Sequence, residues 1–338
     1  MRRVIAFLSV LAACNASAES GLADHQVGPA PGSDGPLAMA ESSSTSGGPG
    51  PAGDSASESP PGDDEDRRFD LREAPDSPTD VGPCDRVDLL FVVDNSGSMA
   101  DEQQHLIASV PGFIDGVESL LGDQTDYHVG VITTDANEFN GIGCRKLGAL
   151  TTQTGGELSS NAACGPYSGG FGFMDASDPL DETFACAAQV GIDGDGIEQP
   201  MHAISALIDV DQGNVALCNE GFLRADALLV LTIITDEEDD GDSPGDPASW
   251  YQTIVDAKGG DASRVVVLSL VGHPKPNECI PSQWTGMMGA EIATRIIEFT
   301  GMFEHGQVGD ICAQDYGPIF AASVVGIAQA CDVVVPVG

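Results

Sequence analysis

Basic residues are scarce in this chain. Thirteen Lys and Arg stand against 53 Asp and Glu, which gives a formal net charge of −40. Such a charge repels phosphate backbones and anionic lipid, so we expect no nucleic-acid partner and no membrane contact through the protein surface itself. Cations or basic groups would suit this charge. The simpler interpretation is solubility in salty surroundings, where screening weakens self-repulsion.

Several catalytic patterns are also lacking. No Cys-x-x-Cys pair occurs, which argues against zinc knuckles and thioredoxin-like chemistry. No His-x-x-x-His pair occurs either, so a catalytic zinc is unsupported. We find no histidine base and no second metal cluster, and Gly97 with Ser98 builds no nucleophile elbow. We therefore do not expect an enzyme.

The chain begins with a targeting segment. An Arg-Arg start precedes an apolar run, Val4 to Leu11, that is too short to span a membrane. Residues 1–13 resemble a bacterial lipoprotein signal peptide, in which Cys14 becomes the lipidated first residue. The alternative is ordinary cleavage after Ala18. Lipidation is favoured because Cys14 lies at the end of the apolar run, and it predicts export to the outer membrane or cell surface.

The cysteine count also indicates export. Without Cys14 an even number remains, which suits disulfides formed in an oxidising compartment. Eight cysteines allow about 105 pairings, so the sequence does not decide among them. The first expectation is a bridge between Cys84 and Cys331, because they flank the predicted domain. The eight candidates are Cys84, Cys144, Cys164, Cys186, Cys218, Cys279, Cys312 and Cys331.

Two regions follow the signal segment. Residues 14–83 are rich in Gly, Pro, Ser and acidic residues and have too few large apolar residues for a core, so they predict a disordered linker. Residues 84–335 alternate strand and helix patterns, which indicates an α/β domain with a doubly wound, mostly parallel sheet flanked by helices.

Expected strands are Val87–Val93, His128–Thr133, Ala227–Thr235 and Val265–Val271, with a weaker one at Leu147–Thr152. Expected helices are Asp101–Leu121 (kinked or split at Pro111), Glu198–Ile208, Pro247–Lys258, Gly286–Phe299 and Ile319–Ala330. Expected disulfide-bearing insertions are Glu138–Ala188 and His273–Trp284.

The most informative stretch is an apolar run that ends in an Asp-x-Ser-x-Ser motif, formed by Asp94, Ser96 and Ser98. The run predicts a buried parallel strand, and the motif then lies at the strand's carboxyl end, where open α/β sheets bind ligands. Oxygen ligands at this spacing suit Mg²⁺ or a similar hard cation. The alternative is a simple strand-to-helix turn with a Ser cap.

A second buried strand ends in the same manner, in Ile-Ile-Thr-Asp236, and four acidic residues follow it. We interpret Glu238 to Asp240 as a solvated acidic loop. Asp236 directly follows the strand, so we expect it over the carboxyl edge of the sheet beside the first motif. Like charges gathered there are costly without a counter-ion.

At these residues the chain resembles the von Willebrand factor A domain family, and in particular its bacterial secreted members, over roughly Val87 to Ala330. The family's metal-ion-dependent adhesion site takes Asp-x-Ser-x-Ser from one loop, a Thr from a second and an Asp from a third. Asp94, Ser96 and Ser98 match the first loop, and Asp236 matches the third. The resemblance implies a Mg²⁺ site to which a protein partner adds a carboxylate.

The second loop departs from the family pattern. The turn before the expected helix at Glu198 contains no Thr or Ser, so Asp195 or Asp193 is the expected oxygen donor there. A carboxylate in that place would favour tighter binding and would make Ca²⁺ or Mn²⁺ plausible beside Mg²⁺. It would also weaken the ion's attraction for a partner's carboxylate. The alternative for both residues is a Gly-rich turn with an Asp helix cap.

These patterns predict a surface-anchored, metal-dependent adhesion module. Its partner is a protein that offers a carboxylate, and its own contact with the membrane is through the lipid anchor alone. The alternative is a structural envelope lipoprotein, stapled by disulfides, whose ion only stabilises the fold. The sequence does not decide the oligomeric state.

Overall fold

The computed structural model describes residues 85–121, 126–209, 215–274 and 289–333. The expected signal segment, lipidation site and linker lie outside these residues. So do Cys84 and Cys279, most of the expected insertion at 273–284 and the first three residues of the helix expected at 286–299.

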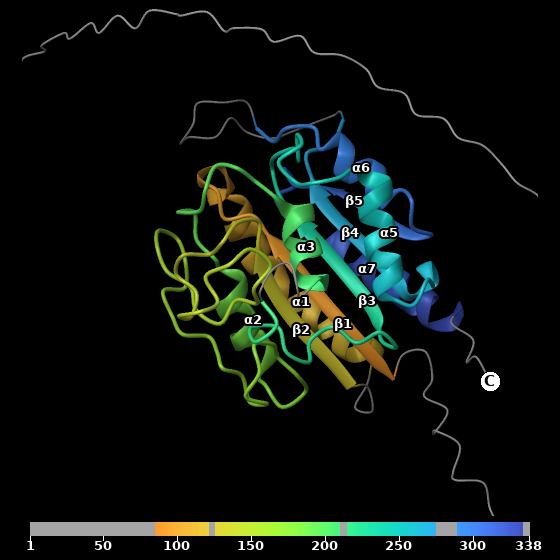
Figure 1. The fold of residues 1–338 in the computed structure, drawn as a ribbon, viewed down its shortest axis with the longest axis horizontal. Coiled ribbons are helices and arrows are strands. Elements are labelled where there is room, and N and C mark those ends of the chain that lie inside the picture. The colour runs from red at the N-terminus through yellow and green to blue at the C-terminus, as the bar shows by residue number, and fades with distance from the viewer. Residues whose placement is uncertain (1–84, 122–125, 210–214, 275–288, 334–338) are drawn as a thin grey trace, which may run out of the picture. The chain divides into compact units, whose positions relative to one another are not determined.

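Five strands form a parallel sheet in the order β2-β1-β3-β4-β5 (Figure 1). They are β1 (Arg86–Val93), β2 (Asp126–Thr133), β3 (Leu228–Ile234), β4 (Val265–Val271) and β5 (His305–Asp310). Strands β3 and β4 are buried along their whole length, as expected for continuous apolar runs covered on both faces. The predicted doubly wound, parallel α/β fold is confirmed.

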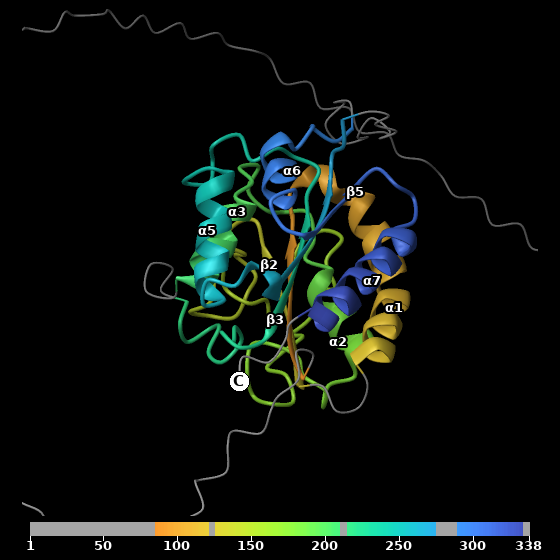
Figure 2. The same cartoon turned by 90° about the vertical axis from the view of Figure 1, so that its right-hand side faces the viewer.

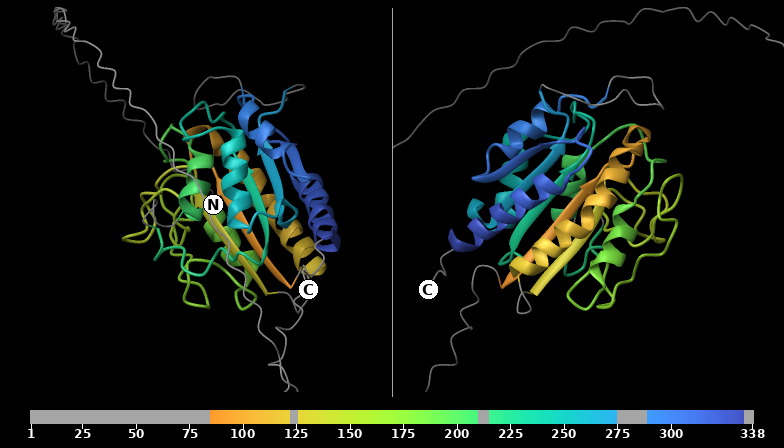
Figure 3. Two further views of the ribbon diagram at one scale, coloured as in Figure 1. Left: turned by 45° about the vertical axis from the view of Figure 1, so that its right-hand side comes forward. Right: turned by 180° about the vertical axis from the view of Figure 1, so that it is seen from behind.

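Helices cover both faces of the sheet, as the edge-on view shows (Figure 2). One face carries α1 (Glu102–Leu121), α2 (Leu180–Ala188) and α7 (Gly317–Val333), and α1 and α7 are seen together from behind in Figure 3. The other face carries α3 (Pro200–Ile208), α5 (Pro247–Ala257) and α6 (Thr294–Thr300). Two short 3₁₀ turns, Gly97–Ala100 and Ala262–Arg264, complete the described elements.

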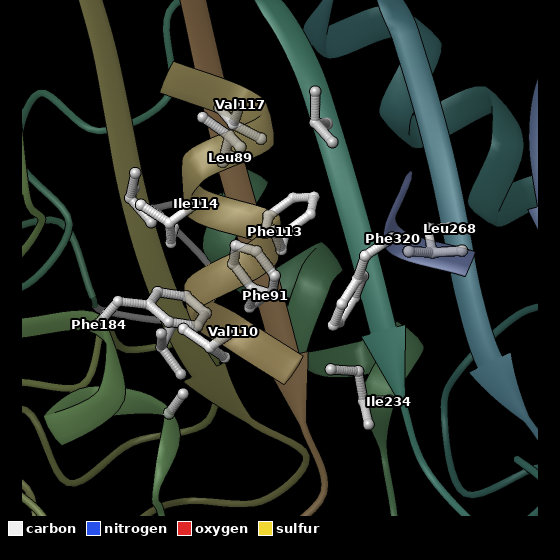
Figure 4. Packing of buried hydrophobic residues seen from close by; sticks show 14 of the residues in the cluster. Leu89, Phe91, Val110, Phe113, Ile114, Val117, Phe184, Ile234, Leu268 and Phe320 are labelled. Carbon is white, nitrogen blue, oxygen red and sulfur yellow. The ribbon is translucent and has the colours of Figure 1, made fainter. Parts of the chain in front are cut away.

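The core consists of one apolar layer on each side of the sheet, because successive side chains of a strand point to opposite faces. In the layer beneath α1, Phe91 of β1 lies between Phe113 and Phe184, with ring centroids 5.7 and 4.5 Å away (Figure 4). Each such side chain contributes roughly 1.5–3 kcal/mol by its burial. This packing fixes β1, and with it the position of the motif at its end.

The structure corrects several sequence expectations. Residues 147–152 form no strand, although the Thr151 N–H donates to the Val131 carbonyl of β2 at 2.8 Å. Residues 289–293 are not helical, and α6 begins at Thr294. Pro111 lies inside α1 without splitting it: proline removes one helical N–H, but the apolar face of α1 stays buried in the core on both sides of it.

Two elements were not predicted. Strand β5, with sequence HGQVGD, lacks an apolar run because it is an edge strand paired on one side only, with β4. Helix α2 lies inside the Gly-rich insertion at 138–188. It has only nine residues, too few for its apolar periodicity to stand out among the loop-forming residues around it. The same insertion covers the opposite edge of the sheet, where Met174 forms an antiparallel bridge with Val129 of β2.

Two disulfides hold this insertion, Cys144–Cys218 and Cys164–Cys186. Cys312 and Cys331 are also disulfide-bonded, whereas the expected partner Cys84 lies outside the described residues. Disulfides indicate an oxidising compartment outside the cytosol. Within the described ranges, no helix is long and apolar enough to cross a membrane.

Candidate functional site

The predicted site lies where β1 and β3 end side by side. Val93 pairs with Ile234, and the Asp94 N–H donates to the Ile234 carbonyl at 2.9 Å. The residues that follow both strands therefore meet at the carboxyl edge of the sheet. In the order β2-β1-β3 this is the point where the winding of the sheet reverses, the usual ligand position in doubly wound folds.

Four of the six predicted metal ligands come together here. The Ser96 and Ser98 hydroxyl oxygens are 2.8 Å apart, and the Ser98 hydroxyl donates to Asp236 Oδ1 at 3.0 Å. Asp94 is fully buried, and its carboxylate accepts the Ser96 N–H at 2.7 Å. Thr235 donates its hydroxyl to the second oxygen of Asp94 at 2.6 Å, a contact that the sequence interpretation did not include.

The structure places Asp193 and Asp195 differently from the expectation. Both side chains are exposed, and Asp193 Oδ2 accepts the backbone N–H of Glu157 at 2.7 Å. The Asp195 N–H donates to Asp135 at 2.8 Å. These contacts fit the alternative of a Gly-rich turn in part, because a short aspartate in an exposed turn readily accepts a backbone N–H. The expected Asp helix cap is not formed, since the N-cap of α3 is Gln199 and it makes no side-chain cap bond.

The acidic side chain that does reach the site from the second loop is that of Glu198. It is only 2 % exposed, and its Oε2 accepts the hydroxyl of Thr134, which is itself fully buried. Its other oxygen, Oε1, is buried without a hydrogen-bond partner. Its carboxyl group interacts electrostatically with that of Asp94. The sequence could have indicated Glu198 as the oxygen donor of this loop. It lies two residues before Pro200, where α3 begins, and is closer to the helix than Asp193 or Asp195.

Neutral groups hold the loops of the site in place. The Gln103 side-chain amide of α1 donates to the Asp94 carbonyl at 3.0 Å and to the Gly191 carbonyl at 2.6 Å, and its Oε1 accepts the Gly191 N–H at 3.1 Å. On the other side, Asn95 donates to Asp135 at 3.1 Å. The first and second loops are thereby joined by side chains that carry no positive charge.

The carboxyl groups of the site lack a basic partner among the residues that the structure describes. None of the ion pairs among the described residues includes Asp94, Glu198 or Asp236. Burial, and then the charge of Asp94, raises the pKa of Glu198 to about 11 and that of Asp236 to about 8. Burial also raises the pKa of Asp94 itself, although hydrogen bonds from Thr235 and Ser96 oppose this. A nearby cation would reverse these shifts.

The acidic loop after β3 is less solvated than the sequence suggested. Asp239 is fully buried, lies 3.6 Å from Arg295 Nη1, and accepts the Ser243 N–H at 3.0 Å. Arg295 also stacks on the Trp250 ring, 4.5 Å from its centroid. Asp240 alone of residues 238–240 is exposed. Glu237 is half-buried, and burial with the charge of Asp94 raises its pKa to about 7.

The donor set fits a hard divalent cation. No three His, Cys, Asp or Glu side chains within the described ranges form a metal-holding group by themselves. The predicted set, however, includes the hydroxyl groups of Ser96 and Ser98, and carboxylate and hydroxyl oxygens are the ligands that Mg²⁺ and Ca²⁺ prefer. The unpartnered Oε1 of buried Glu198 adds a further oxygen that nothing in the described chain satisfies.

The loop after β3 also contains a match to the nucleophile-elbow pattern of serine hydrolases. Gly241-Asp-Ser243-Pro-Gly245 has the form Gly-x-Ser-x-Gly. A nucleophile of this type must expose its hydroxyl on a sharp strand-to-helix turn. Ser243 is instead 1 % exposed, and its hydroxyl accepts the backbone N–H of His202 at 2.8 Å, which is a structural role.

Comparison with known proteins gives structural matches only. The chain is similar to a von Willebrand factor type A protein from Catenulispora acidiphila, with 12% identity, a TM-score of 0.38 and coverage of 73% of this chain and 42% of that one. It is similar also to proximal thread matrix protein 1 from the mussel byssus, with 10% identity, a TM-score of 0.38 and coverage of 73% and 49%. It thus spans less than half of either protein. No protein-family model and no curated protein match the chain.

The parallel sheet, the helices on both faces and the motif at the end of β1 agree with what the sequence resemblance implies. The fold is von Willebrand factor A-like. At these identities and TM-scores, the two solved structures say nothing about what this chain binds.

Proposed function

We propose that this domain is a cation-dependent protein-binding module. The observation that carries the proposal is the cluster of Asp94, Ser96, Ser98 and Asp236 at the ends of two adjacent strands, buried or half-buried and without an ion pair to any described basic residue. Mg²⁺ is the expected ion, with Ca²⁺ or Mn²⁺ as alternatives, held by these residues directly or through water. The ion would supply positive charge that attracts a partner's carboxylate in a partly dry site.

The chain's own residues would prepare this site. Thr235 and the Ser96 N–H orient the Asp94 carboxylate, and Ser98 orients Asp236. Gln103 fixes the end of β1 against the second loop. These hydrogen bonds restrict the movement of the loops, which would lower the cost of ordering them when an ion binds.

We further propose that the module is exported and acts at the outer membrane or cell surface, attached through Cys14 and held away from the membrane by residues 14–83. The disulfides Cys144–Cys218 and Cys164–Cys186 support export. The partner would approach the carboxyl edge of the sheet, and the lipid anchor alone would contact the membrane.

A second candidate function is structural, with an ion that only stabilises an envelope protein. The buried carboxyl of Glu198 favours it, because a further carboxylate neutralises the ion and reduces its attraction for a partner.

Calorimetric titration with Mg²⁺, Ca²⁺ and Mn²⁺ tests ion binding, and Asp94→Ala should abolish it. Exposed Asp240→Asn is the control. Capture of Asp- and Glu-containing peptides on the immobilised protein, with Mg²⁺ or with chelator, then separates the two functions. Capture that needs the ion supports binding, and ion uptake without capture supports the structural role. Peptide capture unchanged by chelator would refute the ion-dependent mechanism.

A further inference from the structure

Glu198 lies at the end of the turn in which the family pattern has a threonine. One residue, Gln199, separates it from α3. The Gln199 N–H donates to the Thr134 carbonyl at 3.0 Å. That bond ties the start of α3 to the end of β2, which lies beside β1 in the sheet. The Glu198 side chain is thereby held at the same edge of the sheet as Asp94.

The environment of Glu198 is unusual for a carboxyl group. The side chain is 98 % buried, since 2 % is exposed, and one of its oxygens is bound by Thr134. The other oxygen, Oε1, has no partner. A buried oxygen left unpaired costs about 1–3 kcal/mol, and more when it is charged. Its neighbour is another buried carboxyl, that of Asp94, which can accept a hydrogen bond from Glu198 while Glu198 is protonated but offers it no partner once both groups are charged.

We propose that Glu198 is a direct ligand of the cation, contributing Oε1 as a third carboxylate beside Asp94 and Asp236. The three side chains do not form a metal-holding group as they stand, so they would have to close around the ion on binding. This inference rests on the cation site proposed above. A divalent ion resolves both difficulties at once, because it gives the unpaired oxygen a partner and neutralises the two adjacent carboxylates. The threonine of the family pattern would contribute a neutral oxygen instead, so the two sites differ by one negative charge.

The extra charge has a consequence for ion choice. Mg²⁺ is usually bound through one or two carboxylates and keeps several waters, whereas Ca²⁺ accepts more oxygen ligands in a flexible arrangement. A third carboxylate therefore favours Ca²⁺ over Mg²⁺ relative to a site with threonine. It also leaves the filled site with a net charge of about −1, from three carboxylates and one divalent ion, which weakens its attraction for a partner's carboxylate.

The test compares Glu198→Gln, Glu198→Thr and the wild-type chain in calorimetric titrations with Ca²⁺ and Mg²⁺. Glu198→Gln keeps the size of the side chain and removes its charge, and it should weaken Ca²⁺ binding by about 10- to 100-fold. Glu198→Thr should shift the preference toward Mg²⁺. Exposed Asp195→Asn, in the same turn, removes the same charge at a position outside the site and should leave both affinities unchanged.

Water-proton relaxation of the Mn²⁺-loaded protein distinguishes a ligand from a residue that only positions others. Loss of the ligand oxygen should add a bound water in Glu198→Ala, whose side chain offers no oxygen, whereas loss of a positioning contact would weaken binding without adding one. Unchanged affinities, or an unchanged water count, would overturn the assignment. If Asp94→Ala also binds as the wild type does, the cation site itself is wrong. If Asp94→Ala abolishes binding and Glu198→Gln does not, only this inference fails.

Folding is checked by thermal unfolding in chelator. Glu198→Gln removes a buried carboxyl beside Asp94, so the ion-free variant should be at least as stable as the wild type. Should it nevertheless fail to fold, Glu198→Thr still decides the proposal through its affinities for Ca²⁺ and Mg²⁺, because retention of the wild-type Ca²⁺ affinity would overturn it.

Discussion

Strand β1 carries a fully buried aspartate near each of its ends, and the two are treated in opposite ways. At the amino end, Asp88 accepts Arg224 Nε and the Arg224 backbone N–H, both at 2.8 Å, and lies 3.5 Å from Lys258 Nζ. At the carboxyl end, Asp94 accepts the Thr235 hydroxyl and the Ser96 N–H. Burial raises its pKa, and further hydrogen bonds from the Ser96 and Glu198 side chains oppose this rise. One aspartate lies beside two cations of the protein, and the other forms no ion pair with any described residue.

The contrast extends to the neighbours of each aspartate. The amino end gathers Arg86, Arg224 and Lys258 from a chain with only 13 basic residues, and Lys258 is fully buried although burial lowers its pKa. The carboxyl end gathers further acidic side chains, Glu198 and Asp236. Within the described residues these carboxylates form no ion pair, which supports the cation site proposed above. At the amino end, the charge of Asp88 is already balanced by the basic side chains of Arg224 and Lys258.

The strongest test exchanges each aspartate for asparagine in the ion-free protein. Asp88→Asn leaves the buried Lys258 without its charged partner and should lower the free energy of unfolding by about 3–5 kcal/mol. Asp94→Asn retains an acceptor for Thr235 and removes an uncompensated charge, so it should change the free energy by less than about 1 kcal/mol. Urea unfolding in chelator measures both. Equal losses at the two ends would break the comparison.

Adding the ion should narrow the difference between the two variants. At a free concentration 100 times its dissociation constant, a divalent cation should stabilise the wild type by about 2.7 kcal/mol. Asp88→Asn should keep this increment, because its site is intact, and Asp94→Asn should lose it. The measurement is the shift of the urea midpoint on adding Ca²⁺ or Mg²⁺, and an increment retained by Asp94→Asn would place the ion elsewhere.

A third test concerns the neutral bonds of the carboxyl end. Gln103→Leu removes three hydrogen bonds to Asp94 and Gly191, and each contributes about 0.5–1.5 kcal/mol, so the ion-free protein should lose about 2 kcal/mol. The nearby Gln104→Leu loses one bond, to the Ala100 carbonyl, and serves as the control. A loss no greater than that of the control would mean that contacts other than those of Gln103 hold the loops together.

The smallest effect is expected at the rim of the amino end. Arg86 contacts Asp126 and Asp226, but these side chains are 40% to 58% exposed. Arg86→Met should therefore cost less than about 1 kcal/mol, and high salt should remove the difference. A larger, salt-independent loss would mean that the rim is as important as the buried pair at Asp88.

The sequence predicted the strands whose apolar runs are continuous and the four site residues that directly follow two of them. Parallel strands bring their carboxyl ends together, so adjacency in the sheet was enough to place Asp94 beside Asp236. Glu198 was passed over because it was assigned to the start of a helix. Its burial depends on the contact between the start of α3 and the end of β2, which no local pattern reveals.

The amino-end network was likewise beyond local patterns. Arg224 and Lys258 are far from Asp88 in sequence and meet it only when β1, β3 and α5 have packed. Strand β5 was not predicted for a different reason. It is an edge strand that is only partly buried, so its sequence does not contain the continuous apolar run that a central strand needs.

The Cys144–Cys218 disulfide has a topological consequence. It closes a segment with a sequence separation of 74 residues, which includes the turn at Gly191, Glu198 and the whole of α3. A protease that cuts once anywhere inside this segment leaves both pieces covalently linked. Cleaved protein should therefore run as one species on a non-reducing gel and as two after reduction. Cleavage in the turn at residues 191–198 would therefore release no part of the protein while the disulfide is intact.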